Sequence, residues 1–186
     1  YEVTVNICAP SNASAGLGPA FSVKAHLHGS SRVADSVVLS TNVIHVYSLD
    51  SSVTETEFAV DPATTLIVPF TTLNDGNGPD RYDMRVSRVT SLATGSEVLW
   101  DVDVPRSLLS ELERDDSEVI EVRVNVPEQV TAGDYEVVID VFSEEAYPDS
   151  DGRSTRLRDS ITLSVHVNEF HDMRLWLDPF VESDIK

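Results

Sequence analysis

Apolar and polar residues alternate at every second position along most of this chain. The stretch EVIEVRVNV at 118–126 shows the pattern, and YEVVIDVF at 135–142 and SITLSVHV at 160–167 repeat it. A period of two with many Val, Ile and Thr residues is typical of strands that bury one face. The pattern therefore predicts an all-β fold.

Turn-forming residues separate these stretches. Gly, Pro, Asn and Asp gather at 74–80 (NDGNGPD) and at 148–152 (PDSDG), and such clusters mark turns. We expect the glycines of the first cluster to adopt positive φ angles. About seven antiparallel strands in a unit of about 120 residues predict a two-sheet, immunoglobulin-like sandwich.

One stretch has apolar residues at helical spacing instead. It is VPRSLLSELERDD at 104–116, where Leu108, Leu109 and Leu112 share one helical face. The stretch is short, so it predicts no more than a turn or two of helix between strands.

The chain also repeats itself. Three pairs of segments match in the same order: VNICAPSNASAGLGPAFSVKAHL (5–27) with VNVPEQVTAGDYEVVIDVF (124–142), ADSVVLSTNVIHV (34–46) with RDSITLSVHVNEF (158–170), and FAVDP (58–62) with LWLDP (175–179). The spacing of about 120 residues indicates a repeat of that length. We therefore divide the chain into the C-terminal half of one unit (1–50), a complete unit (51–170) and the first strand of a following unit (171–186). On this division the chain is a window on a longer array.

The complete unit carries a set of degenerate motifs. They are an Asn-x-Gly-Asn-Gly loop, a strand with an aromatic residue, a later Trp and a closing Val-x-Val-Pro…Ala-Gly-x-Tyr-x-Val. The residues are Asn74, Gly76, Asn77, Gly78, Tyr82, Trp100, Val124, Val126, Pro127, Ala132, Gly133, Tyr135 and Val137. With these motifs the unit resembles the immunoglobulin-like modules found in tandem in archaeal and bacterial surface proteins, including the NPCBM-associated and CARDB-like modules.

That resemblance implies a role and a place. Such modules serve as spacers, stalks, adhesion surfaces or subunits of layers and filaments outside the cell, and they have no catalytic centre. The unit departs from the usual form by an insertion at 144–158, between its last two strands. Because added loops often carry function, a specific partner contact is expected there.

The chain is strongly acidic. Its formal net charge is −19, from 32 acidic and 13 basic residues, and only Lys24 and Lys186 are lysines. This charge disfavours binding to nucleic acid or to an anionic membrane, and no apolar run reaches the length of a membrane span. The acidity serves solubility, or it reflects a salt-adapted archaeal source, because charge repulsion is screened within about 3 Å in 1 M salt.

Few residues suggest chemistry. None of the histidines lies in a G-x-S-x-G or H-E-x-x-H motif, so we do not expect an enzyme. His26 and His28 are predicted on one strand face, where a solvated pair is favoured over a metal site. Cys8 is the single cysteine, which excludes an internal disulfide; we expect it to be a buried apolar residue in a strand.

Calcium is the one cofactor that the residues suggest. The run Asp149-Ser150-Asp151-Gly152 alternates oxygen ligands before a glycine turn, and Asp159 or Glu145 would complete the shell. The candidate ligands are thus Asp149, Asp151 and Asp159. A second acidic loop at 75–80 fits a turn better. Asn12 begins the sequon Asn-Ala-Ser, which predicts a glycan in a surface turn.

Two functions fit these features. The first is a non-catalytic, extracellular structural or interaction protein, a repeat segment of a stalk, S-layer or filament, whose partners are copies of itself or neighbouring repeats. Its odd ends then either exchange strands between copies or are completed by the rest of a giant chain. The alternative is a carbohydrate- or protein-binding module of a secreted enzyme. Against sugar binding, Trp100 and Trp176 lie in apolar strand contexts.

Overall fold

The protein is built from β-strands alone in the part of the chain that is described. The structure is a computed structural model and describes residues 3–29, 32–104, 109–148 and 154–170. The strands in these ranges are β1 Gly16–Leu17, β2 Phe21–His26, β3 Val33–Leu39, β4 Asn42–Val43, β5 Leu49–Val53, β6 Glu57–Val60, β7 Thr65–Asn74, β8 Tyr82–Ser91, β9 Ser96–Glu97, β10 Asp101–Asp103, β11 Ser117–Asn125, β12 Gly133–Pro148 and β13 Ser154–Val167. The predicted all-β class is confirmed.

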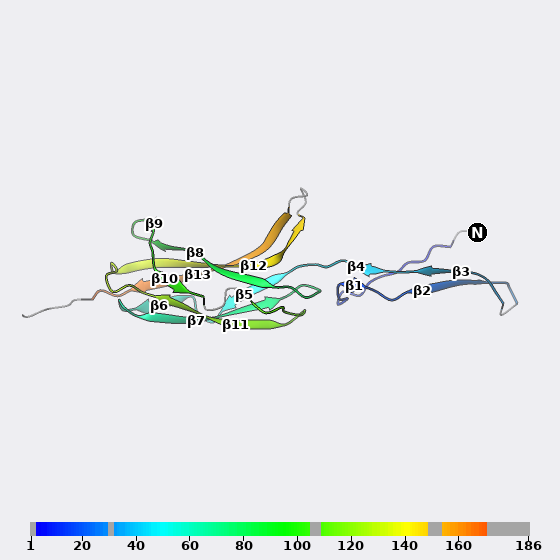
Figure 1. The fold of residues 1–186 in the computed structure, drawn as a ribbon, viewed down its shortest axis with the longest axis horizontal. Coiled ribbons are helices and arrows are strands. Elements are labelled where there is room, and N and C mark those ends of the chain that lie inside the picture. The colour runs from blue at the N-terminus through cyan, green and yellow to red at the C-terminus, as the bar shows by residue number, and fades with distance from the viewer. Residues whose placement is uncertain (1–2, 30–31, 105–108, 149–153, 171–186) are drawn as a thin grey trace, which may run out of the picture.

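Strands β5 to β13 form a two-layer sandwich (Figure 1). One sheet has the order β10-β11-β7-β5 and the other the order β6-β13-β12-β8-β9. All neighbours are antiparallel except β6, which pairs in parallel with β13 at the sheet edge. Two packed antiparallel sheets of this kind are the immunoglobulin-like architecture that the alternating pattern predicts.

The core lies between these two sheets. Alternate residues of β11 line it, among them Val122 and Val124, whereas β12 buries every residue from Val137 to Val141. The pairing of β12 with β8 shifts register between Val138 and Ile139. All buried apolar residues of the described chain lie between Val60 and Val167. Each fully buried Val, Ile or Leu side chain contributes roughly 1.5–3 kcal/mol to folding.

A buried tyrosine fixes the turn that leads into β12. The Tyr135 hydroxyl donates a hydrogen bond to the Thr131 carbonyl at 2.7 Å, a bond to backbone a few residues upstream that is known as a tyrosine corner. The Trp100 ring packs on Tyr135 with ring centroids 4.7 Å apart. Gly133 has a φ of 137°, which favours glycine. The Ala-Gly-x-Tyr motif thus serves the corner, and Trp100 packs against the core.

The N-terminal residues form a separate, thinner body. β2 pairs with β3 and β1 with β4, and both pairs are antiparallel. This body extends from one end of the sandwich (Figure 1). Gly16 pairs with Val43 as Gly133 pairs with Val167, and these two pairs correspond in the sequence repeat. The division of the chain at residues 50 and 170 stays a prediction.

The helix predicted at 104–116 is wrong over its described part, 104 and 109–116, which contains no helix and has a turn at Arg114 and Asp115. Leu109 N donates to the Tyr82 carbonyl at 2.8 Å, and Leu112 forms a two-way bridge with Asp80. Both leucines are buried because this segment closes the side of the core. Leu108 lies outside the described residues.

Two further expectations are also wrong. Cys8 is exposed and lies in no strand, since the sheet that would cover it is not present in the described N-terminal body. His28 lies in the turn after β2 rather than on a strand face with His26. The insertion at 144–158 in part lengthens the β12–β13 hairpin, which pairs as far as Pro148 and Ser154. In the described ranges, no helix is long and apolar enough to cross a membrane.

Candidate interaction site

The N-terminal body, residues 3–46, exposes apolar residues that the complete unit buries. We call it the open half-unit. Phe21, which pairs with Leu39, is 39% exposed, whereas Val137, which pairs with Leu163 at the corresponding place in the repeat, is fully buried. None of the residues from Val3 to Ala59 whose burial is described is buried. The half-unit has the strand pattern of a sandwich and lacks a sandwich core.

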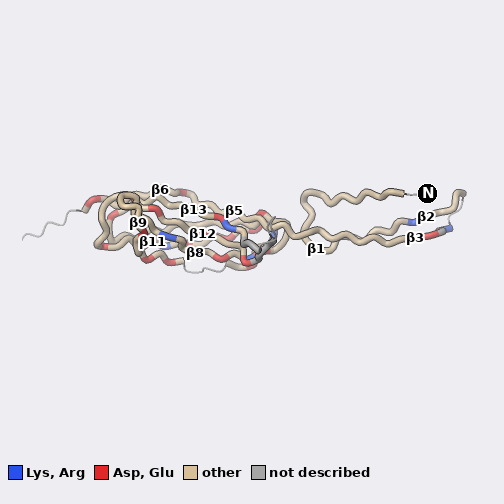
Figure 2. Tube along the Cα trace, turned by 90° about the horizontal axis from the view of Figure 1, so that it is seen from above, with Lys and Arg blue, Asp and Glu red and all other residues tan. Residues whose placement is uncertain are grey.

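A groove runs along the open half-unit. Its volume is about 770 Å³, and it lies between the extended segment 7–10 and the β1–β4 region. Figure 2 shows the N-terminal trace running back beside β2 and β3. The groove walls include Ile7, Pro10, Phe21, Thr41, Val43 and Ile44. The walls of the groove are largely apolar.

Strands β3 and β4 of the half-unit each have one edge without a partner strand among the described strands. In the complete unit β13 lies between β12 and β6. Its counterparts in the half-unit, β3 and β4, each pair on one side only among the described strands. An edge of this kind presents backbone N–H and C=O groups that favour pairing with another strand. The apolar groove and the strand edge thus lie on the same body.

The loop at residues 74–80 of the sandwich forms hydrogen bonds to the half-unit. Its residue Asn77 accepts a hydrogen bond from Val46 N on Oδ1 at 2.7 Å and donates from Nδ2 to the Ile44 carbonyl at 2.9 Å. Its backbone N–H donates to the Val46 carbonyl at 3.1 Å, and its carbonyl accepts from Ala15 N at 2.7 Å. We call this set of bonds the junction clasp.

Two glycines of this loop allow the close approach. A Cβ atom at Gly76 would lie 2.7 Å from the Val46 carbonyl oxygen, and one at Gly78 would lie 2.9 Å from Nε2 of His45. Neither glycine has a positive φ, so the expectation from turn chemistry is wrong. The loop holds its shape through Asn74, whose Nδ2 donates to the Gly78 carbonyl at 2.9 Å and whose Oδ1 accepts from Gly76 N at 2.9 Å.

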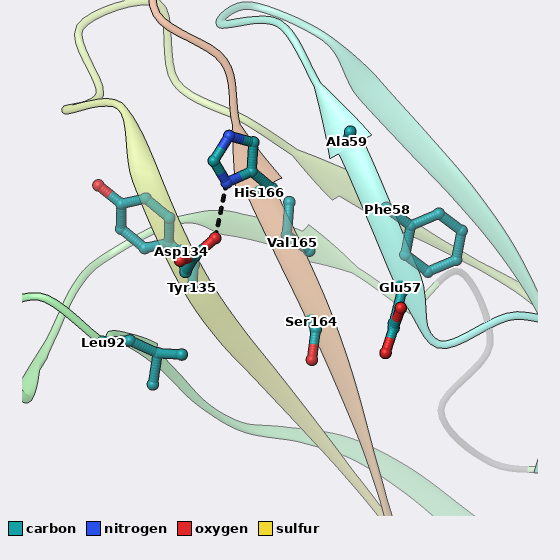
Figure 3. A pocket seen from close by; sticks show the side chains of 9 residues that line it. All are labelled: Glu57, Phe58, Ala59, Leu92, Asp134, Tyr135, Ser164, Val165 and His166. Carbon is teal, nitrogen blue, oxygen red and sulfur yellow. Dashed lines mark hydrogen bonds and ion pairs between the residues drawn. The ribbon is translucent and has the colours of Figure 1, made fainter.

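A shallow pocket lies on the β6–β13–β12 sheet of the sandwich (Figure 3). Asp134 Oδ1 and His166 Nδ1 are 2.6 Å apart, and both side chains are more than half exposed. Ser164 lies on the same strand as His166, but its hydroxyl points away from the imidazole (Figure 3). Since a nucleophile must reach its base within hydrogen-bond distance, these three residues form no catalytic triad in this arrangement.

A polar network centred on the buried Asp140 lies where the β12–β13 hairpin leaves the sandwich. Asp140 accepts from Arg158 at 2.8 Å and from the Ser160 hydroxyl at 2.7 Å. Burial acts to raise the pKa of Asp140, but hydrogen bonds from Ser160, Arg158 and Ser87 and the Arg158 charge outweigh it, so the pKa lies below its usual value. The network stabilises the base of the insertion.

The predicted calcium ligands are not brought together among the described residues. Asp149 and Asp151 lie outside them. Asp159 accepts from Ser51 N at 2.9 Å and from Ser160 N at 2.8 Å, one bond on each carboxylate oxygen. No group of three metal-ligand residues occurs in the described ranges. The calcium site stays a prediction.

The remaining predicted residues lie at the surface. Asn12 is exposed in a turn, where a glycan would project, and its glycosylation stays a prediction. His26 is exposed on β2. Sequence reasoning missed the role of Asn77, although the density of Asn and Gly at 74–78 could have indicated a close backbone approach as well as a turn.

No protein-family model matches this sequence, and no curated protein matches it. Solved structures do. A family 123 glycoside hydrolase from Clostridium perfringens is 11% identical over 64% of this chain and 27% of its own, with a TM-score of 0.48. The PapD-like domain 7 of human CEP192 is 15% identical over 65% of this chain and 87% of its own, with a TM-score of 0.43. Domains 4 and 5 of the S-layer protein SbsC are 17% identical over 72% of this chain and 51% of their own, with a TM-score of 0.37. At these identities the likeness concerns the β-sandwich alone.

Proposed function

We propose that this chain is a segment of a non-catalytic, extracellular structural or interaction protein built from tandem immunoglobulin-like sandwiches. The observation that carries the proposal is the contrast between its two bodies. The sandwich buries its apolar face between Val60 and Val167, while the open half-unit leaves an equivalent face uncovered. A face of this kind is covered by further strands in a working assembly.

The junction clasp supports the same proposal. It holds the half-unit to the sandwich through four hydrogen bonds centred on Asn77. A fixed junction between successive units suits a stalk, layer or filament, which must transmit force and keep its spacing. A flexible tether of independent binding modules would not need it.

The proposed role is a non-catalytic one. It is supported by the arrangement of Ser164, His166 and Asp134, in which the hydroxyl does not face the imidazole (Figure 3). The acidic surface, with its net charge of −19, suits an exposed location. A salt-adapted source remains an expectation from composition, and it requires that the unfolding free energy increase between low and molar NaCl.

The test is to locate and weigh the native protein. Antibodies raised against residues 49–167 should label the surface of intact cells of the source, and the envelope fraction should contain the antigen in a large covalent chain or a large particle. Mass spectrometry under denaturing conditions separates those two forms. An antigen found only inside the cell, as a small monomer, would contradict the proposal.

A further inference from the structure

We propose that Asn77 is a deamidation site that the junction clasp protects, and that its deamidation keeps the clasp open. Asn77 is followed by Gly78, and this is the one Asn-Gly pair in the sequence. Asn is among the chemically labile residues of proteins. The junction between the half-unit and the sandwich thus carries a spontaneous, one-way chemical change, wherever the protein is located.

Deamidation of an Asn-Gly pair needs no reactant other than water. The backbone nitrogen of Gly78, after losing its proton to solvent, attacks the side-chain carbonyl carbon (Cγ) of Asn77. The amide nitrogen takes a proton from water and leaves as ammonia, so that a cyclic succinimide forms. A water molecule then opens the ring, either to an aspartate or to an isoaspartate in which the main chain continues through Cγ. A following glycine favours the attack because it has no Cβ beside the nitrogen.

The closed clasp opposes this reaction. Ring closure draws the side-chain amide of Asn77 against the peptide bond that follows it, so both groups must move. All four polar groups of Asn77 are held by hydrogen bonds of 2.7–3.1 Å. The Gly78 carbonyl accepts a further bond from Nδ2 of the fully buried Asn74 at 2.9 Å. The Asn-Gly pair is therefore fixed on both sides, and its reaction requires a local opening.

The clasp requires the same two residues that make it reactive. A Cβ atom at position 78 would lie 2.9 Å from Nε2 of His45 and 3.0 Å from Cβ of Ala15, so glycine fits there best. The Asn77 side chain supplies one acceptor and one donor to the backbone of the half-unit. A carboxylate in its place would supply acceptors only. The labile pair thus follows from the fit of the junction.

Neither product can form the clasp again. An aspartate has no donor at the place of Nδ2, so a carboxylate oxygen would face the Ile44 carbonyl oxygen, where the two atoms are now 2.9 Å apart. Two acceptors at this distance repel each other. An isoaspartate lengthens the main chain by one carbon, which displaces the N–H and C=O groups that bond Val46 and Ala15. Deamidation therefore leaves the junction open.

Peptide mapping of the full chain by mass spectrometry tests the protection. The chain is incubated at mildly alkaline pH, once folded and once in urea, and the fraction of Asn77 converted to an acid is followed over time. Conversion in urea should be at least about tenfold faster, since the population of the open clasp limits the rate in the folded chain. Equal rates in the two conditions, or no conversion in urea, would overturn the proposal.

Two substitutions at position 46 test whether the clasp itself provides the protection. Val46→Pro removes the N–H that donates to Asn77 Oδ1, because proline has no backbone N–H. In the folded variant Asn77 should deamidate roughly 2- to 10-fold faster than in the wild type. Val46→Ala is the control, since it keeps the N–H and shortens an exposed side chain, and its rate should equal that of the wild type. The same rate in both variants would contradict protection by the clasp.

Asn77→Asp tests the effect of the product. Proteolysis of this variant between residues 44 and 48 should be about 5- to 100-fold faster than that of the wild type, because both side-chain bonds of the clasp are weakened or lost. Asn125→Asp is the control, since it adds the same charge where the side chain bonds Thr65 and Asp101 within the sandwich. It should leave this cleavage unchanged. Cleavage of Asn77→Asp at the wild-type rate would overturn the one-way opening.

Discussion

Asn77 and Val46 exchange two hydrogen bonds, as two residues in neighbouring strands do. Val46 N donates to Asn77 Oδ1 at 2.7 Å, and Asn77 N donates to the Val46 carbonyl at 3.1 Å. A side-chain amide here replaces the backbone of a second strand. Asn77 thus holds the end of the half-unit against the sandwich, beside the bond from Asp75 N to the Ser48 carbonyl.

Replacing Asn77 by Ala should loosen this junction. The variant loses the side-chain bonds to Val46 N and the Ile44 carbonyl, each contributing about 0.5–1.5 kcal/mol. We expect proteolysis between residues 44 and 48 to accelerate about 5- to 100-fold, with the melting temperature of the sandwich unchanged. Asn125→Ala is the control, because its side chain bonds Thr65 and Asp101 within the sandwich. Equal proteolysis of both variants would refute the role of the clasp.

Gly78→Ala should disturb the same junction by a different route. The new Cβ would lie 2.9 Å from Nε2 of His45 and 3.0 Å from Cβ of Ala15, so the His45 ring and Ala15 must shift. We expect a smaller maximum dimension or a broader distribution of shapes in small-angle scattering. Adding His45→Ala should recover part of the wild-type profile, since it removes one of the two close contacts. A profile for Gly78→Ala identical to that of the wild type would contradict this close approach.

Replacing one phenylalanine in each body by alanine should change the unfolding free energy by different amounts. Phe70 is fully buried in the sandwich, and Phe70→Ala should cost about 3–5 kcal/mol of unfolding free energy. Phe21 is 39% exposed in the open half-unit, and Phe21→Ala should cost less than about 1 kcal/mol in the dilute chain. Chemical denaturation followed by the tryptophan signal measures both, and similar costs would mean that the half-unit is packed.

Asp140 should make stability depend on pH. Its pKa is lower in the folded chain than its usual value, so its ionised form stabilises the fold above about pH 4. This stabilisation is lost as the pH falls through the lower, folded pKa. Asp140→Asn should therefore cost about 1–3 kcal/mol at pH 7, with the difference shrinking at pH 3 in urea titrations. A difference that is constant with pH would contradict the ionised network of Asp140, Arg158 and Ser160.

Much of the sandwich could be predicted from the sequence, because period-two alternation fixes which face of a strand is buried. The stretch 118–126 is an example, since Ile120, Val122, Val124 and Val126 are all buried. Which residues of a strand are buried depends on neighbouring positions along the chain, so the local sequence predicts it.

The predictions that were wrong concern residues whose contacts are distant in the sequence. The leucines at 109 and 112 suit a helix locally, but their segment bridges to Asp80. Gly78 has its role because His45 approaches from the preceding body. Cys8 lies in an alternating stretch, yet no described sheet covers it. In each case the local conformation or burial depends on residues far away in the sequence, and neither the spacing of apolar residues nor the composition indicates that contact.

Hydrogen exchange with mass spectrometry tests the central claim most directly, namely that a closed sandwich carries an open half-unit. In the dilute chain, amides of β12 and β13 should exchange slowly, with the free energy of global unfolding. Amides of β2 and β3 should exchange orders of magnitude faster. Slow exchange of β2 and β3 in the dilute, monomeric chain would show that the half-unit is closed by itself, and it would contradict the account.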